Sequence, residues 1–344
     1  MKKSLFVLGV AVAALASCTN EEVVSMPEGS AIDFNSFVNN NTKAVTGVDA
    51  TGLGTNFYVI GYYGNATGSM TNPVFKNEIS TTNYFWQANN YYQFAAYANG
   101  KVGTQGAAED VQLPTEDVAY TAGGSLVISD YTVNDAHDLV AAISEQRQCT
   151  STIGNAKVEL TFKHMLAKVC FTFTTPVGEN YTLKISELKF NAKTSGKCTY
   201  NGTDASWSDG TNGDYKYEDI ADLTTTANET ADGTYAQTLE KFAIPQNVPA
   251  SGTQISVSFK ATISGGGLTE KSATLTGNLS VPTDNEWKAG YVYNYTTEVT
   301  AEKIDPTLEN QKIEFTVEEI KDWNTTWTTP DGDDEVDLPT TTQP

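Results

Sequence analysis

The amino-acid sequence predicts an all-β protein built from two β-sandwiches. Three observations support this prediction: apolar and polar residues alternate over short runs, Gly together with Asn-Gly and Asp-Gly pairs separates the runs, and helical periodicity is scarce. Strands of this kind expose one polar face and one apolar face, and they bury the apolar face by packing one sheet against another. A β-sandwich therefore accounts for the pattern better than a helical or mixed fold.

The N-terminus has the features of a signal peptide, which we expect to span residues 1–17. Lys2 and Lys3 precede an uncharged apolar run at residues 5–15, and small residues then lead to Cys18. The run is shorter than the ~20 residues of a membrane-spanning helix, so it fits a cleaved secretory signal. A cysteine after such a small-residue box predicts lipidation, by palmitate or a similar fatty acid, although an ordinary signal with an incidental cysteine is the alternative.

The charge of the chain is strongly acidic and restricts its partners. Forty-two acidic residues face twenty-one basic ones, which gives a formal net charge of -21. Such a surface repels phosphate backbones and anionic lipid head groups, so no nucleic-acid partner is expected. The lipid on Cys18 would be the attachment to a membrane.

We divide the chain into four parts after the signal peptide. Residues 18–29 form a polar tether, residues 30–155 an N-terminal β-sandwich, residues 156–329 a C-terminal β-sandwich, and residues 330–344 an acidic, solvated tail. The boundary lies in a small polar stretch at residues 149–156. A calcium site in the tail is the alternative to simple solvation.

The first predicted element is a strand at residues 31–38. Ile32 and Phe34 are two positions apart and fall on one face of a strand, which we expect to point inward, with Phe37 as a further inward candidate. Residues 135–148 are the best helix candidate, because Leu139, Ala142 and Ile143 could form an apolar stripe.

The second half alternates more regularly. Alternation predicts strands at residues 160–173, 255–263, 291–295 and 313–317, whereas residues 201–232 read as a long surface insertion. Turn candidates are Asn201-Gly202, Asp209-Gly210 and Asp232-Gly233.

No catalytic or metal-binding motif is found, so we predict neither enzymatic activity nor a cofactor nor a bound metal. His164 ends an alternating run and is expected at the surface or in a turn. Cys149, Cys170 and Cys198 show no metal-ligand spacing, and three thiols cannot all pair within one chain, which leaves their disulfide state open. A pair of carboxylates for glycoside hydrolysis and tryptophans that stack on sugars remain alternatives.

Four segments together resemble the fimbrillin family, lipoprotein pilins also called type V pilins. They are the lipidation box and tether at 18–22, the first strand leading to 41–44, the segment 138–169, and the segment from 287 to Trp323. The resemblance implies two tandem transthyretin-like sandwiches, display on the outer membrane, and a major or minor subunit, tip component or anchor of a surface fimbria. It also implies strand exchange with other fimbrial subunits, and adhesion to a host protein or glycan receptor.

The resemblance further implies proteolytic maturation and a donor strand. Many family members are cut after an arginine in the first segment, and the matching position here is Lys43, before Ala44; the only arginine, Arg147, lies elsewhere. Cleavage by another enzyme would release the first strand, and without cleavage the chain would stay anchored. The candidate donor residues are Ile313, Phe315 and Val317 in one segment, and Val336 and Leu338 in the tail.

A surface glycan-binding lipoprotein built from similar sandwiches is the alternative function. A ring of exposed tryptophans or tyrosines on one loop face would favour it.

Overall fold

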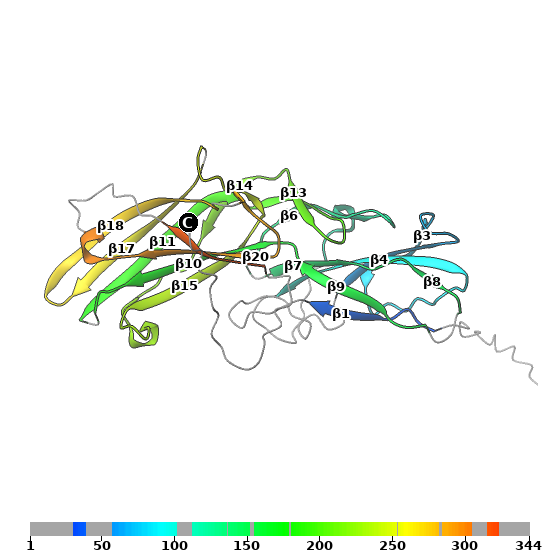
Figure 1. Ribbon diagram of the computed structural model, residues 1–344, viewed down its shortest axis with the longest axis horizontal. Coiled ribbons are helices and arrows are strands. Elements are labelled where there is room, and N and C mark those ends of the chain that lie inside the picture. Colours follow the sequence, from blue (N-terminus) through cyan, green and yellow to red (C-terminus); the bar gives the residue numbers. More distant parts are fainter. Residues whose placement is uncertain are drawn as a thin grey trace, which may run out of the picture.

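The computed structural model describes residues 30–38, 57–101, 112–135, 137–151, 155–178, 180–252, 254–281, 284–304 and 315–322. These residues form an elongated molecule made almost entirely of strands (Figure 1). The helical elements in this part of the chain are three short 3-10 turns, η1 (Thr115–Asp117), η2 (Thr226–Asn228) and η3 (Ala301–Ile304). The prediction of an all-β protein is confirmed.

A seven-stranded sheet forms the end of the molecule that contains the N-terminal residues. Its strands, in spatial order, are β1 (Phe34–Val38), β9 (Val158–His164), β7 (His137–Ile143), β4 (Asn90–Lys101), β2 (Tyr58–Gly64) and β3 (Asn72–Ile79), with β8 (Arg147–Cys149) paired to β4. β1 and β3 lie at opposite ends of this strand order, yet Phe34 of β1 packs on Phe75 of β3 with ring centroids 5.5 Å apart. The sheet is therefore strongly curled.

A four-stranded sheet covers the other face of this curled sheet. Its order is β13 (Ala205–Ser208), β12 (Ser195–Tyr200), β6 (Leu126–Thr132) and β5 (Val118–Tyr120). Leu126 and Ile128 of β6 share one buried apolar cluster with Tyr97 of β4 and Leu139 of β7. Sheet-on-sheet packing of this kind is a β-sandwich.

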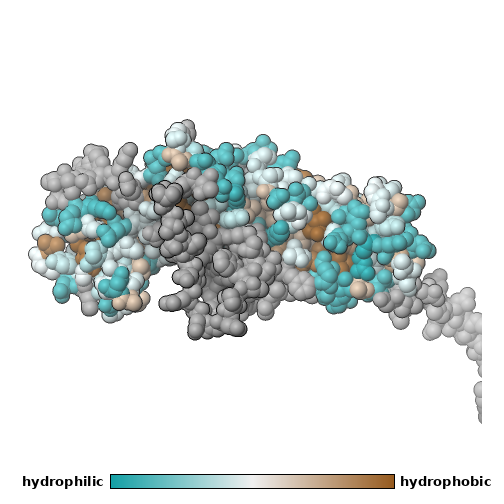
Figure 2. Space-filling view, in the orientation of Figure 1, coloured by the Kyte–Doolittle hydropathy of each residue, from teal (hydrophilic) through white to brown (hydrophobic). Residues whose placement is uncertain are grey.

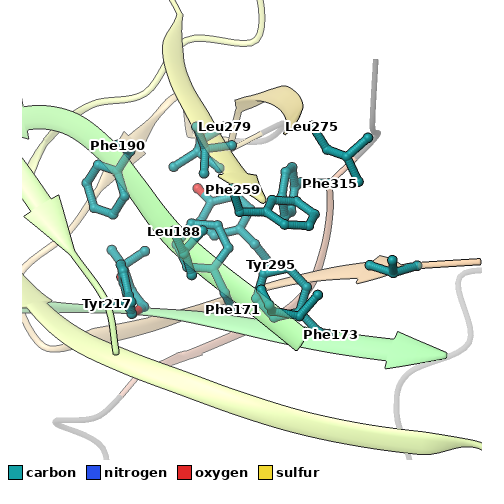
Figure 3. Packing of buried hydrophobic residues seen from close by; sticks show 14 of the residues in the cluster. Phe171, Phe173, Leu188, Phe190, Tyr217, Phe259, Leu275, Leu279, Tyr295 and Phe315 are labelled. Carbon is teal, nitrogen blue, oxygen red and sulfur yellow. The ribbon is translucent and has the colours of Figure 1, made fainter. Parts of the chain in front are cut away.

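The second sandwich consists of two four-stranded sheets. One contains β15 (Tyr235–Ala243), β10 (Ala167–Thr175), β20 (Tyr291–Glu298) and β21 (Thr316–Asp322); the other contains β14 (Asn212–Lys216), β11 (Tyr181–Lys193), β17 (Ile255–Gly265) and β18 (Leu268–Leu279). A large aromatic and aliphatic core lies between them (Figure 3). A short pair, β16 (Gln246–Asn247) with β19 (Glu286–Trp287), lies apart from both sheets.

The chain passes between the two sandwiches three times: from β9 to β10, from β11 to β12 and, through residues 209–211, from β13 to β14. Met165 and Leu166 alone separate β9 of the first sandwich from β10 of the second, and Thr194 alone separates β11 from β12. The pairings therefore cross the predicted boundary at residue 155, because β9, β12 and β13 all pair within the first sandwich. The division into two tandem domains stays a prediction.

Two sequence expectations are wrong. The helix expected at residues 135–148 is replaced by β7 and β8. In β7, Val140 and Ala142 pack in one core cluster whereas Leu139 and Ala141 pack in another. A strand that is buried on both faces loses its polar alternation, and its apolar run then imitates a helical stripe.

The expected surface insertion at residues 201–232 is the second error. It contains β13 and β14, and four of its side chains are buried in the second core: Tyr215, Tyr217, Ile220 and Leu223. The polar residues of this segment include those on the exposed faces of β13 and β14, which are short strands at the edges of their sheets. Figure 2 shows a mixture of hydrophilic and intermediate side chains over the described surface on this face, with small hydrophobic patches between them.

Candidate functional site

The segment that contains the first strand pairs with two different parts of the chain. From Phe34 to Val38 it runs parallel to β9, in the register Phe34↔Val158. Just before β1, the amide of Ile32 donates to the carbonyl of Tyr84 at 2.8 Å, and the amide of Trp86 donates to the carbonyl of Ser30 at 3.2 Å. The segment therefore closes a gap between β9 and residues 84–86.

The side chains of this segment fill an aromatic socket. Ile32 is 2% exposed. The half-buried ring of Phe34 meets three phenylalanines edge-on, with centroid distances of 5.9 Å to Phe57, 5.5 Å to Phe75 and 5.4 Å to Phe94. Burying an apolar side chain of this size contributes ~1.5–3 kcal/mol to stability. Without the segment, the socket and the edge of β9 would both face water.

The C-terminal strand β21 lies in the second sandwich. It pairs antiparallel with β20 at the edge of its sheet. Phe315, immediately before β21, is 8% exposed and packs 5.5 Å from Phe171 and 6.3 Å from Phe259, measured between ring centroids (Figure 3). Val317 is partly buried against the same core. Two candidate donor residues thus belong to the chain's own core.

A polar cleft of about 740 Å³ opens between the two sandwiches. One wall is the β12–β13 turn and β13; the opposite wall is formed by β16 and the residues around β19, and the end of β9 contributes to the lining. The residues that line it are mostly polar or aromatic, among them Lys163, Lys193, Tyr200, Thr203, Asp204, Ser206, Trp207, Gln246, Asn247, Glu286, Lys288 and Tyr291.

Comparison with known protein families identifies the family to which this chain belongs. Residues 32–323 match the sequence model of the family described as Fimbrillin-like. The protein is a member of the Fimbrillin-like family. The match covers most of the chain, including both sandwiches and the first strand, so the resemblance drawn from the four sequence segments is confirmed.

Solved structures align with this Fimbrillin-like chain over most of their length. A fimbrial protein from Bacteroides vulgatus is 15% identical, with a TM-score of 0.50, and the alignment covers 84% of this chain and 99% of that one. The fimbrial anchor protein Mfa2 from Porphyromonas gingivalis is 10% identical, with a TM-score of 0.33, and the alignment covers 87% and 100%. No curated protein matches the sequence.

His164 of this Fimbrillin-like protein lies in the interior, so the expectation that it lies at the surface or in a turn is wrong. Its Nδ1 lies 2.7 Å from Oδ2 of Asp138, and both side chains are 0% exposed. Lys168 is also buried, with its Nζ 3.4 Å from Oε1 of Glu240. Burial lowers the pKa of Lys168, and Glu240 opposes that shift. These buried polar and charged groups gather where β9 passes into β10, at the junction between the two sandwiches. Breaking such a buried pair by removing one partner is destabilising.

The three cysteines beyond Cys18 are buried, free thiols. Burial raises the pKa of Cys170 and of Cys198 to about 12, which makes both poor nucleophiles. In the described ranges, no group of three or more His, Cys, Asp or Glu side chains is arranged to hold a metal ion. Nor does any helix there have the length and apolar character to cross a membrane.

Several predicted site residues lie outside the described residues. They are Cys18, Lys43, Ala44, Ile313, Val336 and Leu338, and the side chain of Phe37 is likewise not described. Lipidation, maturation and the tail donor therefore stay predictions.

Proposed function

We propose that this Fimbrillin-like protein is a component of a surface fimbria, as a structural subunit, tip or anchor, that joins other subunits by β-strand exchange and serves adhesion. The observation that supports the proposal is the seating of the first strand. It lies at a sheet edge, it closes a gap between β9 and residues 84–86, and Phe34 occupies a socket of three phenylalanines.

A strand in this position can be exchanged. Its loss would leave unpaired backbone groups along β9 and an open aromatic socket, and an alternating strand from a neighbouring subunit would satisfy both at once. The contact is heterologous, so its repetition generates an open fibre. Cleavage after Lys43 would cut the covalent link between the first strand and the rest of the chain, and it would separate Ala44 from the lipid on Cys18.

The donor strand is assigned to the C-terminal residues. Val317 and Phe315, with Ile313 before them, are one candidate; donation would require Phe315 to leave its contacts with Phe171 and Phe259. Val336 and Leu338 are the other candidate, which would leave β21 in place. Uncleaved, the chain would remain a lipid-anchored protein of the outer membrane.

The test uses a chain that begins at Ala44, mixed with peptides spanning residues 30–42, 310–322 or 323–344. We expect the 30–42 peptide and one C-terminal peptide to bind and to raise the melting temperature, and we expect the truncated chain to form fibres visible by electron microscopy. A 30–42 peptide with Phe34→Asp is the matched control and should not bind. If no peptide binds and no fibre forms, strand exchange is wrong for this chain.

The alternative function, a surface glycan-binding lipoprotein, predicts exposed aromatic rings on one loop face. Trp86 and Trp287 are buried, at 2% and 1% exposed, and they offer no such ring. Trp207 differs, because it is half-buried and lines the polar cleft.

A further inference from the structure

The cleft between the sandwiches has the chemical composition of a saccharide site. Its volume of about 740 Å³ lies within the ~300–1,000 Å³ typical of small-ligand pockets. Two aromatic rings, Trp207 and Tyr291, stand among hydroxyl, amide and carboxylate groups along its walls. Aromatic faces receive the C–H faces of sugar rings, whereas carboxylates and amides bind sugar hydroxyls.

The ring of Trp207 is held in position before any ligand arrives. Its Nε1 donates to the carbonyl of Met165 at 2.8 Å, and its ring meets Tyr131 edge-on at 5.7 Å between centroids. A Cβ added at Gly196 would lie 3.3 Å from Cε3 of Trp207, so the glycine lets the ring rest on the backbone of β12. A fixed ring loses little conformational entropy when a ligand stacks on it.

Internal bonds also fix the walls of the cleft. Nζ of Lys163 donates to the carbonyl of Thr203 at 3.0 Å, which ties β9 to the β12–β13 turn. Oδ1 of Asn201 accepts from the amides of Thr203 and Asp204 at 2.8 Å and 2.7 Å, which shapes the turn that presents Asp204. On the opposite wall, Oε1 of Gln246 accepts from the amide of Lys193 at 3.0 Å.

Three polar groups of the lining remain available to a ligand. Within the described part of the chain, no hydrogen bond or ion pair engages the carboxylate of Asp204, the ammonium group of Lys193 or the side-chain amide of Asn247. The other lysines have partners, since Lys288 pairs with Asp284 at 2.8 Å and Lys163 binds Thr203. Three lysines of the lining, Lys163, Lys193 and Lys288, are balanced by the lining carboxylates Asp204 and Glu286 and by Asp284, the partner of Lys288, so the cleft is close to neutral.

We infer that this cleft binds a neutral oligosaccharide. The aromatic rings supply the stacking surface, Asp204 and Asn247 bind hydroxyl groups, and Lys193 donates to a ring or hydroxyl oxygen. The near-neutral lining and the net charge of -21 both disfavour polyanionic glycans. The site is independent of strand exchange, because neither β1 nor β21 contributes to its lining.

The test probes the whole mature chain with an array of neutral oligosaccharides that end in galactose, mannose or N-acetylglucosamine, together with their sialylated and sulfated counterparts. We expect binding to neutral members, and we expect Asp204→Asn to weaken it roughly tenfold or more, because a charge-assisted hydrogen bond to a sugar hydroxyl is lost. Asn247→Ala should weaken it as well.

Asp209→Asn is the matched control. Asp209 is exposed and follows β13, but it does not line the cleft, so this variant should bind like the native chain. Melting temperatures verify that each variant is folded. Binding to no array member, binding only to acidic glycans, or equal binding by the Asp204→Asn and Asp209→Asn variants would overturn the inference. Fibre formation by the Asp204→Asn chain is expected to be normal, which separates this result from a failure of the fimbrial proposal.

Discussion

The first and last described strands hold similar positions but are attached differently. Phe34 begins β1 and Phe315 immediately precedes β21, each in an aromatic cluster, and each strand lies at the end of its sheet's strand order. The β1 segment pairs with β9 and, just before, with residues 84–86, whereas β21 has β20 as its one strand partner among the residues that the structure describes. Removing the first segment therefore opens a gap with two sides, whereas removing the last takes one edge strand from a sheet and withdraws Phe315 from the core. A two-sided gap suits an acceptor, and a strand held on one side suits a donor.

Locking each strand in place is the strongest way to test this contrast. Asn35 of β1 is paired with Glu159 of β9, with Nδ2 2.8 Å from Oε1, so Asn35→Cys with Glu159→Cys should form a disulfide between the strands. We expect this lock to abolish fibre formation by electron microscopy, because β1 can no longer leave, and we expect a reductant to restore it. Fibres from the oxidised, fully cross-linked protein would show that β1 does not exchange.

A second lock identifies the donor. Thr296 of β20 is paired with Thr316 of β21, so Thr296→Cys with Thr316→Cys should hold β21 in its own sheet. Loss of fibres in the oxidised state is expected if Phe315 and Val317 are donated. Fibres that persist would exclude β21 as the donor and would assign that role to Val336 and Leu338.

Lipid attachment depends on Cys18, which precedes the first strand in the sequence. Replacing Cys18 by Ser should abolish fatty-acid labelling and release the protein from membranes, because the thiol that carries the lipid is missing. Metabolic labelling and membrane pelleting measure both effects. Cys149→Ser is the control and should keep label and membrane attachment; labelling of the Cys18→Ser chain would disprove the assignment.

Truncating the two phenylalanines should reveal different stability contributions. Phe315 is 8% exposed and Phe34 is only half-buried, so we expect Phe315→Ala to lower the free energy of unfolding by ~3–5 kcal/mol and Phe34→Ala by roughly 2–3 kcal/mol. Urea unfolding measures both. Phe→Leu at each site should lower the free energy of unfolding by less. A larger loss of this free energy at Phe34 than at Phe315 would contradict the expectation.

The smallest effect is expected at the junction that joins the two sandwiches. Burial lowers the pKa of Lys168 below the ordinary lysine value of 10.5, so the unfolded chain binds that proton more tightly than the folded chain. The free energy of unfolding should therefore rise as pH increases through the folded pKa toward 10.5. Lys168→Met should flatten this rise, measured by urea unfolding across pH. Lys184→Met, at a lysine that is 46% exposed, is the control, and an identical pH slope in both variants would contradict the expectation.

Local features of the fold were predictable where one face of a strand meets water. The alternation at residues 255–263 corresponds to β17, in which Val257, Phe259, Ala261 and Ile263 are buried. The turn predicted at Asn201-Gly202 joins β12 to β13. The turn predicted at Asp209-Gly210 is wrong, because β13 and β14 continue in one register along β12 and β11. Gly210 nevertheless has a φ of +95°, with the position of a Cβ only 1.9 Å from the carbonyl oxygen of Ser195. Only glycine fits there.

Prediction failed where local pattern and burial diverge. The apolar run in β7 is buried on both faces, so it lacks the alternation that identifies a strand. His164 was expected at the surface or in a turn, and only its contact with Asp138 across β9 and β7 explains its burial. The cleft was not predicted either, because its walls come from four distant segments of the chain.

By itself, the sequence determined that this protein is made of strands, where some of its turns lie, and that its N-terminus resembles a lipoprotein signal. Period-two alternation and glycine turns act within a few residues, so they can be read locally. Only the tertiary structure decided that β1 lies parallel to β9, with Asn35 bonded to Glu159 across 124 residues, and that β12 pairs with β6. Strand partners are chosen by whole surfaces that become complementary only when the chain has collapsed, and no short segment carries that information.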